Sequence, residues 1–394
     1  MKLSYAGKQE PEAFLRTRAI PIGGLDRGWK GSLLIHGENA DVMRALIKHH
    51  GLAGKIDLVY IDPPFATNTT FRIGEHRTAT ISSRNSDRVA YEDNLEGAQF
   101  IEFLRERLVL IRELLSERGS IYLHIDYKIG QYVKVAMDEI FGFENFRNDI
   151  TRIKCNPKNF SRRGYGNIKD LVLFYSKTDR FIWNEPRESV SREAIERLYK
   201  KKDSNGRRYT TVPVHAPGET ASGPTSKPWR GMLPPKGRHW RCDPAELDRL
   251  DAEGLIEWSK TGNPRRINYA EDAERRGKKL QDIWDFKDQQ YPEYPTQKNM
   301  QMLETIVSAS SNSDSVVLDC FCGSGTTLIA AEKLGRRWIG VDQSDPGIEV
   351  AKRRLSDVGL FSREYVDLRH RAQSTEGSNQ TIVAASGGVS IGVR

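Results

Sequence analysis

A strand, a glycine turn, a helix and a second strand follow one another near the C-terminal end, and this unit constrains the fold most. The β-branched segment 316–319 runs directly into a turn that contains Gly323 and Gly325, and a helical stretch follows it. A second apolar segment then ends in Asp342. Strand, helix and strand in this rhythm predict a parallel sheet with helices on both faces.

Apolar segments earlier in the chain extend the same pattern. Residues 33–36, 55–61 and 120–125 are predicted as buried strands, and residues 171–175 as one more. Apolar residues recur at helical spacing between positions 100 and 115. The sequence therefore predicts an α/β fold, built on a Rossmann-like sheet with helices on both faces.

The segment 176–286 breaks this rhythm. It is rich in Lys, Arg, Gly, Pro and Trp and shows no regular apolar pattern, which is typical of an inserted module with irregular loops. We therefore predict a core in two halves, 1–175 and 287–359, separated by an insertion at 176–286. Residues 360–394 thin out into small and polar residues, and we predict a flexible C-terminal tail there.

Charge and cysteine content bear on the partners. The 394 residues include 61 Lys and Arg against 53 Asp and Glu, a formal charge of +8 that favours polyanionic partners. Apolar runs are too short for a membrane span and the N-terminus lacks a secretory signal, so we expect a cytoplasmic protein with no membrane partner. The four cysteines have neither paired spacing nor nearby His ligands, and no metal site is expected.

The glycine turn is a candidate cofactor site. Gly323 and Gly325 let a ligand approach the backbone, and the following helix offers free N–H groups to an anionic group. Asp342 stands about where such a unit places a carboxylate against a ribose diol. No Gly-Lys-Ser/Thr follows, and the third glycine of a dinucleotide fingerprint is missing. A cofactor with an adenosine and a carboxylate, such as S-adenosylmethionine, fits these features better than one with a pyrophosphate.

Asp62-Pro63-Pro64-Phe65 is the candidate catalytic segment, at the carboxyl end of the predicted strand 55–61. Two consecutive prolines stiffen the loop and hold the preceding aspartate still. An exocyclic amine is a poor nucleophile, and two acceptors on its N–H groups would expose its lone pair. The Asp62 carboxylate and the Pro63 carbonyl can be these acceptors, while Phe65 can stack on a base. The alternative interpretation is a rigid turn without chemistry.

These segments together resemble the amino-methylating DNA methyltransferases of bacterial restriction-modification systems, in the β-class order that places Asp-Pro-Pro-aromatic before Phe-x-Gly-x-Gly. Residues 34–39, 294–299 and 334–342 resemble further family segments, although Glu38 stands where Asp is usual. The resemblance implies an S-adenosylmethionine-dependent methyltransferase sheet with an inserted target-recognition module. It implies cofactor contacts from Asp319, Phe321, Gly323, Ser324, Gly325, Thr326, Thr327, Asp342, Thr296, Gln297, Lys298 and Asn299.

The resemblance also implies a substrate and partners. Adenine methylators of the family mostly begin the catalytic segment with Asp, so Asp62 favours the N6 amino group of adenine in double-stranded DNA. The N4 amino group of cytosine and RNA stay open as alternatives, as does a non-catalytic DNA-recognition subunit. The resemblance implies a restriction subunit and a second copy of the chain as candidate partners. A nicotinamide-dependent oxidoreductase would leave Asp62-Pro63-Pro64-Phe65 unexplained.

The insertion supplies candidate DNA contacts, because Arg can bind phosphates and guanine edges and Trp and His can wedge or stack. The candidates are Arg207, Arg208, Trp229, Arg230, Arg238, His239, Trp240 and Arg241. The alternative is that the charges solvate a loop-rich surface and that both tryptophans are core. His124 and Asp126, near the expected pocket, are interpreted as structural, as are Cys320 and Cys322.

Overall fold

The computed structural model describes residues 2–26, 31–64, 70–73, 88–92, 97–157, 161, 163–290, 292, 294, 297–359 and 364–368. The chain divides into two compact units, one formed by Met1–Asn184 with Gln281–Arg394 and the other by Glu185–Leu280. The predicted insertion 176–286 contains the second unit and extends beyond it at both ends. Ser176 lies on a strand of the first unit's sheet, as does Trp284. The second unit is therefore shorter at both ends than the predicted insertion.

A nine-stranded sheet organises the first unit, in the order β16-β6-β7-β5-β2-β17-β18-β1-β19. The strands are β1 (Leu33–His36), β2 (Ile56–Ile61), β5 (Leu115–Ile125), β6 (Phe146–Ile153), β7 (Lys169–Ser176), β16 (Ile283–Trp284), β17 (Val316–Asp319), β18 (Arg337–Asp342) and β19 (Glu364–Asp367). The predicted α/β class is confirmed. The sheet is not wholly parallel, because β7 turns back from β6 and inserts antiparallel between β6 and β5.

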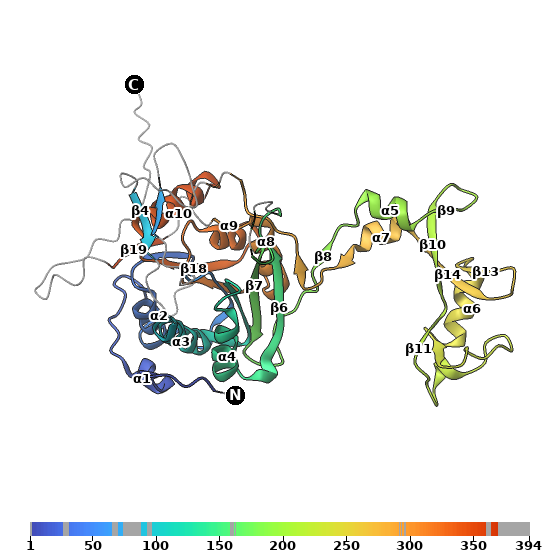
Figure 1. Cartoon of the computed structure of the whole chain (residues 1–394), viewed down its shortest axis with the longest axis horizontal. Helices are drawn as coiled ribbons and strands as arrows, with labels where there is room; N and C mark the ends of the chain where they lie inside the picture. The colour runs from blue at the N-terminus through green and yellow to red at the C-terminus, as the bar shows by residue number, and fades with distance from the viewer. Residues whose placement is uncertain are drawn as a thin grey trace, which may run out of the picture. The chain divides into compact units, whose positions relative to one another are not determined.

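Helices cover both faces of this sheet (Figure 1). They are α1 (Pro11–Arg16), α2 (Asn39–Lys48), α3 (Gly97–Leu114), α4 (Gly130–Phe141), α8 (Met300–Ser310), α9 (Thr326–Lys333) and α10 (Asp345–Asp357). Alternate strand residues such as Val59, Ile121 and Leu123 pack with α2, α3 and α4 in one apolar core. Their neighbours along the strands, including Tyr60, Tyr122 and His124, are equally buried and therefore face the other helix layer.

The prediction of a flexible tail at residues 360–394 is wrong for the short segment 364–367. Residues 364–367 form β19, which pairs in parallel with β1 at the edge of the sheet. The remaining residues of that prediction, 360–363 and 369–394, lie outside the described residues except for Leu368. The strand pair β3 (Thr70–Ile73) and β4 (Arg88–Glu92) completes the first unit. Among the described residues, no helix is long and apolar enough to cross a membrane.

The second unit has a small core of its own. Its strands are β8 (Arg187–Glu188), β9 (Lys201–Lys202), β10 (Arg208–Pro213), β11 (His215–Pro217), β12 (Arg238–Trp240), β13 (Ile256–Trp258), β14 (Pro264–Tyr269) and β15 (Lys278–Lys279). Its helices are α5 (Arg192–Leu198), η2 (Pro224–Ser226), α6 (Pro244–Ala252) and α7 (Ala270–Arg276). A four-stranded sheet in the order β13-β14-β10-β9 is its largest β element.

Gly340, in the middle of β18, lets helix α9 pack closely on the sheet. A Cβ at this position would overlap the side chain of Leu328 on α9. We expect Gly340→Ala to lower the free energy of unfolding by about 1–3 kcal/mol, because overpacking displaces the helix or strains side chains. Denaturant unfolding of the full chain measures this. Gly164→Ala is the control, since a Cβ there meets no atom within 4 Å, and equal stability of both variants would contradict the expectation.

Candidate active site

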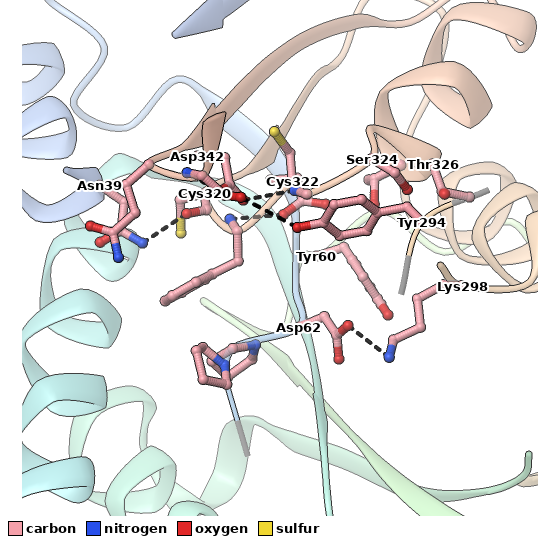
Figure 2. A pocket seen from close by; sticks show the side chains of 18 of the residues that line it. Asn39, Tyr60, Asp62, Tyr294, Lys298, Cys320, Cys322, Ser324, Thr326 and Asp342 are labelled. Atoms are coloured by element: carbon pink, nitrogen blue, oxygen red, sulfur yellow. Dashed lines mark hydrogen bonds and ion pairs between the residues drawn. The ribbon is translucent and has the colours of Figure 1, made fainter. Parts of the chain in front are cut away.

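A cavity of about 490 Å³ opens at the carboxyl ends of β1, β2, β17 and β18. Segments far apart in the sequence line it: residues 37–39 after β1, residues 62–64 after β2, and residues 342–344 after β18. The turn after β17 and the segment before α8 complete the wall. Figure 2 shows that these segments bring Asp62 and Lys298 to one side of the cavity and Asp342 to another. The topology therefore joins the predicted catalytic segment and the predicted cofactor turn in one site.

The glycine turn is held in place by Asp342. Gly323 and Gly325 have φ of +47° and +75°, the left-handed region that favours glycine. One Asp342 carboxylate oxygen accepts the N–H of Gly323 at 2.8 Å, and the other accepts the N–H of Ser344 at 2.8 Å. Burial raises the pKa of Asp342 above its ordinary value, although these N–H groups oppose the shift. Because each carboxylate oxygen can accept more than one hydrogen bond, Asp342 keeps acceptor capacity toward the cavity.

Asp319 supports the turn from below. Its carboxylate accepts the backbone N–H of Phe321 at 3.0 Å, and a hydrogen bond links it to Thr327. Burial raises the pKa of Asp319 to about 7, and these two hydrogen bonds oppose the rise. On α10, Arg354 donates to the side-chain oxygens of Ser324 and Thr326, both at 3.0 Å. Ser324, Thr326 and Thr327 line the cavity, as does Phe321, whereas Gly325 contributes its conformation as the N-cap of α9.

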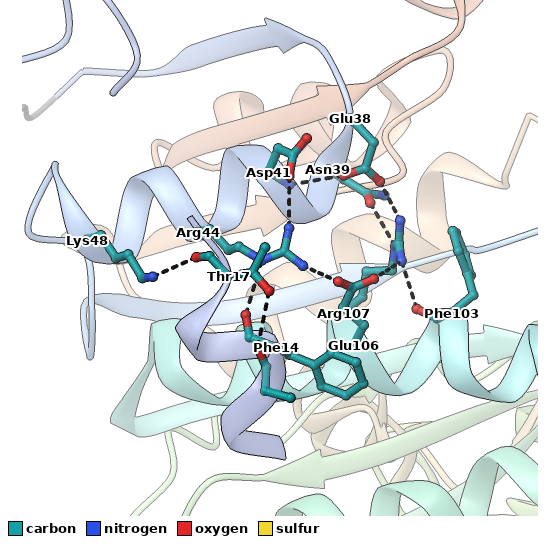
Figure 3. Close-up of polar contacts among 11 residues, drawn as sticks. Phe14, Thr17, Glu38, Asn39, Asp41, Arg44, Lys48, Phe103, Glu106 and Arg107 are labelled. Carbon is teal, nitrogen blue, oxygen red and sulfur yellow. Dashed lines mark hydrogen bonds and ion pairs between the residues drawn. The ribbon is translucent and has the colours of Figure 1, made fainter. Parts of the chain in front are cut away.

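An ion-paired network fixes the wall after β1, and the sequence pattern covered its residues Glu38 and Asn39 but not Arg107. Asn39 donates to the carbonyl of Cys320 at 2.8 Å (Figure 2) and accepts from Arg107 Nε at 2.9 Å (Figure 3). Arg107 also pairs with Glu38, and its guanidinium lies 3.5 Å from the ring centroid of Phe103. A buried arginine on the apolar face of a predicted helix is the signal that could have revealed this contact.

Asp62 lies between two basic side chains. Lys298 Nζ is 2.7 Å from one carboxylate oxygen, Oδ2, and His124 Nδ1 is 3.1 Å from the other, Oδ1. Burial opposes the ionisation of Asp62, but the charges of Lys298 and His124 outweigh it, and the pKa of Asp62 is below its ordinary value. Asp62 is therefore an anion at neutral pH. Asp62 Oδ1 is buried on the side of His124, and Asp62 lines the cavity.

The four residues 296–299, all predicted to contact the cofactor, have different places in the structure. Lys298 pairs with the Asp62 carboxylate, and Gln297 lines the cavity with an Oε1 that has no hydrogen-bond partner in the described part of the chain. Asn299 is not in the cavity wall, because its side chain caps α8 by accepting the N–H of Met302 at 3.1 Å. Pro63 and Pro64 line the cavity, whereas Phe65 and Thr296 lie outside the described residues.

The DNA-contact prediction for the two tryptophans is wrong. Trp229 and Trp240 are 1% and 2% exposed and pack in the core of the second unit, with Val214, Leu247, Leu250 and Ile256. Their indole N–H groups donate to Asp248 and to the carbonyl of Lys227. A side chain held in this way cannot stack on a base. Their place in the core follows from the need of a small insertion to bury apolar area of its own.

The basic candidates of the second unit lie at its surface. Arg207 pairs with Asp203 at 2.8 Å, and Arg230, with φ of +48°, pairs with Asp251 at 2.6 Å. Arg208, Arg238 and Arg241 are exposed, and His239 is half-buried with Nδ1 2.7 Å from the carbonyl of Gly218. Their role in DNA binding stays a prediction.

Comparisons with known proteins agree with the geometry. A family model described as DNA methylase matches residues 56–353. The Type II methyltransferase M.EcaI of Enterobacter cloacae is 41% identical over 356 residues, which cover 87% of this chain and 75% of that protein. The StyLTI Mod subunit, from a Type III restriction-modification enzyme of Salmonella typhimurium, is 27% identical over 85% of this chain and 56% of its own length.

Among solved structures, the M1.HpyAVI–SAM complex is 16% identical with a TM-score of 0.42, covering 82% of this chain and all of the other. The family match and the identity to M.EcaI carry the assignment, and the predicted resemblance to DNA amino-methyltransferases is confirmed. The chain belongs to the DNA methylase family, whose members modify amino groups at N6 or N4 of DNA bases.

Proposed function

We propose that the protein transfers a methyl group from S-adenosylmethionine to the N6 amino group of adenine, at a specific sequence in double-stranded DNA. The observation that carries the proposal is the Asp62 carboxylate, which is anionic, follows directly after β2 and lines the cavity together with Pro63 and Pro64. An amino group that enters the cavity would meet this carboxylate.

The residues of the cavity fit S-adenosylmethionine. Asp342 retains acceptor capacity for a ribose diol, and Gln297 Oε1 is available to a polar group. Phe321 and Phe103, with ring centroids 6.2 Å apart, form an aromatic wall suited to an adenine ring. Gly323 lets a ligand approach the backbone without a Cβ in the way. When bound, the cofactor would supply an electrophilic methyl group on a positively charged sulfur, which keeps the electron pair of the broken carbon–sulfur bond.

The protein's own groups prepare the amine. The target base must leave the duplex stack before its amino group can reach Asp62. One N–H then donates to the Asp62 carboxylate and the other to the Pro63 carbonyl, which draws the nitrogen toward a tetrahedral shape and exposes its lone pair. As the new N–C bond forms, the nitrogen becomes positively charged and strongly acidic. The nitrogen then loses a proton, and Asp62 accepts this proton even though the pKa of the Asp62 carboxyl is low.

Adenine is favoured over cytosine because the catalytic segment begins with Asp, as in most adenine methylators that it resembles. The basic second unit supports double-stranded DNA as the substrate, through its exposed Arg and Lys side chains. A restriction subunit and a second copy of the chain remain partners predicted from the resemblance.

Methylation of DNA that lacks modified adenine and cytosine tests the proposal, with labelled S-adenosylmethionine and chromatography of the digested nucleosides. We expect label in N6-methyladenosine, at positions that define one recognition sequence. Label in N4-methylcytosine would overturn the choice of base and keep the role of Asp62. RNA is assayed in parallel. Label in RNA alone, or no label in either nucleic acid while the cofactor binds, would overturn the proposed reaction on DNA.

A further inference from the structure

Buried charged groups of alternating sign cross four strands of the sheet behind Asp62. Asp62 follows β2, His124 lies on β5, Asp170 on β7, and Arg152 on β6. In the sheet these strands are neighbours in the order β2-β5-β7-β6, and Arg152 lies directly opposite Asp170 in the antiparallel β6–β7 pair. Strand alternation places these side chains on the same face of the sheet. The register thus connects the catalytic carboxylate to charged groups remote from the cavity.

His124 is the link nearest to Asp62, and carboxylates lie at both of its ring nitrogens. Nδ1 is 3.1 Å from Asp62 Oδ1, and Nε2 is 3.2 Å from Asp170 Oδ2. The imidazole is fully buried, and the Tyr60 hydroxyl lies 3.4 Å from Nδ1. Both carboxylate contacts are attractive only when each ring nitrogen carries a hydrogen. The ring therefore has little freedom to turn.

Asp170 is anchored on its far side. Lys154 Nζ is 2.6 Å from its Oδ1, and Arg152 Nη1 is 3.8 Å from its Oδ2. Burial opposes the ionisation of Asp170, but His124 and Lys154 outweigh it and hold the pKa of this carboxyl far below its ordinary value. Arg152 is fixed in turn by the Phe286 carbonyl at 2.9 Å and by Asp288. Asp170 is thus a rigid anion that orients the imidazole.

Lys298 acts on Asp62 from the opposite side. Its ammonium group is 2.7 Å from Oδ2 and is carried by a chain of four methylene groups, which constrains direction poorly. Without His124, the contact with Lys298 alone would orient the Asp62 carboxylate, and the carboxylate could rotate toward Lys298. A rotation of this kind would turn the carboxylate out of the orientation in which it faces the cavity.

We infer that His124, oriented by Asp170, is a positioning residue that holds the Asp62 carboxylate in the orientation in which it meets the amino group of the target base. This inference rests on the proposed function, because it assigns a second residue to the same methyl transfer. It replaces the sequence-based interpretation of His124 as structural. A misplacement of about 1 Å at a reacting group can cost about 100-fold in rate, which sets the expected size of the effect.

Two amide variants separate positioning from packing. In His124→Asn the amide nitrogen can take the place of Nδ1 and donate to Asp62, whereas in His124→Gln it takes the place of Nε2 and donates to Asp170. We expect His124→Gln to lower kcat about 100-fold and His124→Asn to lower it less than about 10-fold. KM for DNA and Kd for S-adenosylmethionine should change less than about twofold in both, since His124 does not line the cavity.

Asp170→Asn and His50→Gln complete the set. Asp170→Asn removes the anchoring charge without touching the cavity and should lower kcat about 10-fold, with unchanged Kd for the cofactor. His50 is a buried histidine whose Nε2 accepts the N–H of Ile22, so His50→Gln controls for the loss of a buried imidazole. Thermal unfolding of each variant shows whether the protein is folded.

The outcomes are distinct. If both His124 variants keep kcat within about threefold of the wild type, the inference is overturned while the proposed function stands. Equal losses in the two variants, accompanied by lower unfolding temperatures and weaker cofactor binding, would also overturn it in favour of packing. Absence of DNA methylation by the wild-type protein would instead overturn the proposed function.

Discussion

Asp62→Ala is expected to lower the rate of methyl transfer at least about 1000-fold, with Kd for S-adenosylmethionine changed less than about threefold. Loss of one preorganised group at a reacting centre typically costs about 100- to 1000-fold, and Asp62 both orients the amine and accepts its proton. The variant also leaves Lys298 and His124 without the carboxylate that they share. Single-turnover transfer of labelled methyl groups measures the rate, and equilibrium dialysis measures cofactor binding.

Two further variants make this result specific. Asp62→Asn keeps the shape of the side chain but loses the charge, and we expect it to be almost as slow. Asp57→Ala removes a carboxylate from β2, where Asp57 accepts the hydroxyl of Ser116 at 2.7 Å, and should leave the rate nearly unchanged. A rate for Asp62→Ala within about 10-fold of the wild type would contradict the mechanism.

Asp342→Ala is expected to raise Kd for S-adenosylmethionine at least about 100-fold. The side chain has two tasks: it accepts the backbone N–H groups of Gly323 and Ser344, and it faces the cavity as the proposed ribose acceptor. A hydrogen bond to a charged group contributes about 1.5–3 kcal/mol. Loss of two hydrogen bonds to the Asp342 carboxylate is therefore enough for the expected rise in Kd. Isothermal titration with S-adenosylmethionine and with its demethylated product measures it.

The control for this prediction is Asp357→Ala, which removes an exposed carboxylate at the end of α10. It should bind the cofactor as the wild type does. Asp342→Asn should fall between the two, because an amide oxygen can accept one of the two N–H groups. Unchanged affinity of Asp342→Ala would show that the cofactor's diol is bound elsewhere and that the glycine turn keeps its form without the carboxylate.

Local patterns predicted much of the fold and the centre of the site. The turn at Gly323 and Gly325 could be recognised because only glycine adopts its backbone angles readily, and Asp62 because two prolines follow a buried strand. Asp342 could be placed because a strand, helix and strand unit has nearly constant length. In each case, the residues that determine the geometry are close in sequence.

Contacts between distant strands could not be predicted in this way. The antiparallel insertion of β7 between β6 and β5 joins strands that are distant in sequence, and that insertion brings Asp170 beside His124. The pairing of Lys298 with Asp62 joins segments more than 200 residues apart. Trp229 was assigned to DNA because the pattern of an irregular insertion does not show which aromatic residues form its core.

The strand order has a consequence for synthesis of the protein on the ribosome. β1 and β2 are made early, yet β17 and β18 separate them in the finished sheet. At about 5–20 residues per second, the C-terminal strands emerge on the order of tens of seconds after β2. A nascent chain therefore holds the catalytic carboxylate without its cofactor turn. We expect methylation to begin only after translation of both strands, so incomplete chains would not modify the genome.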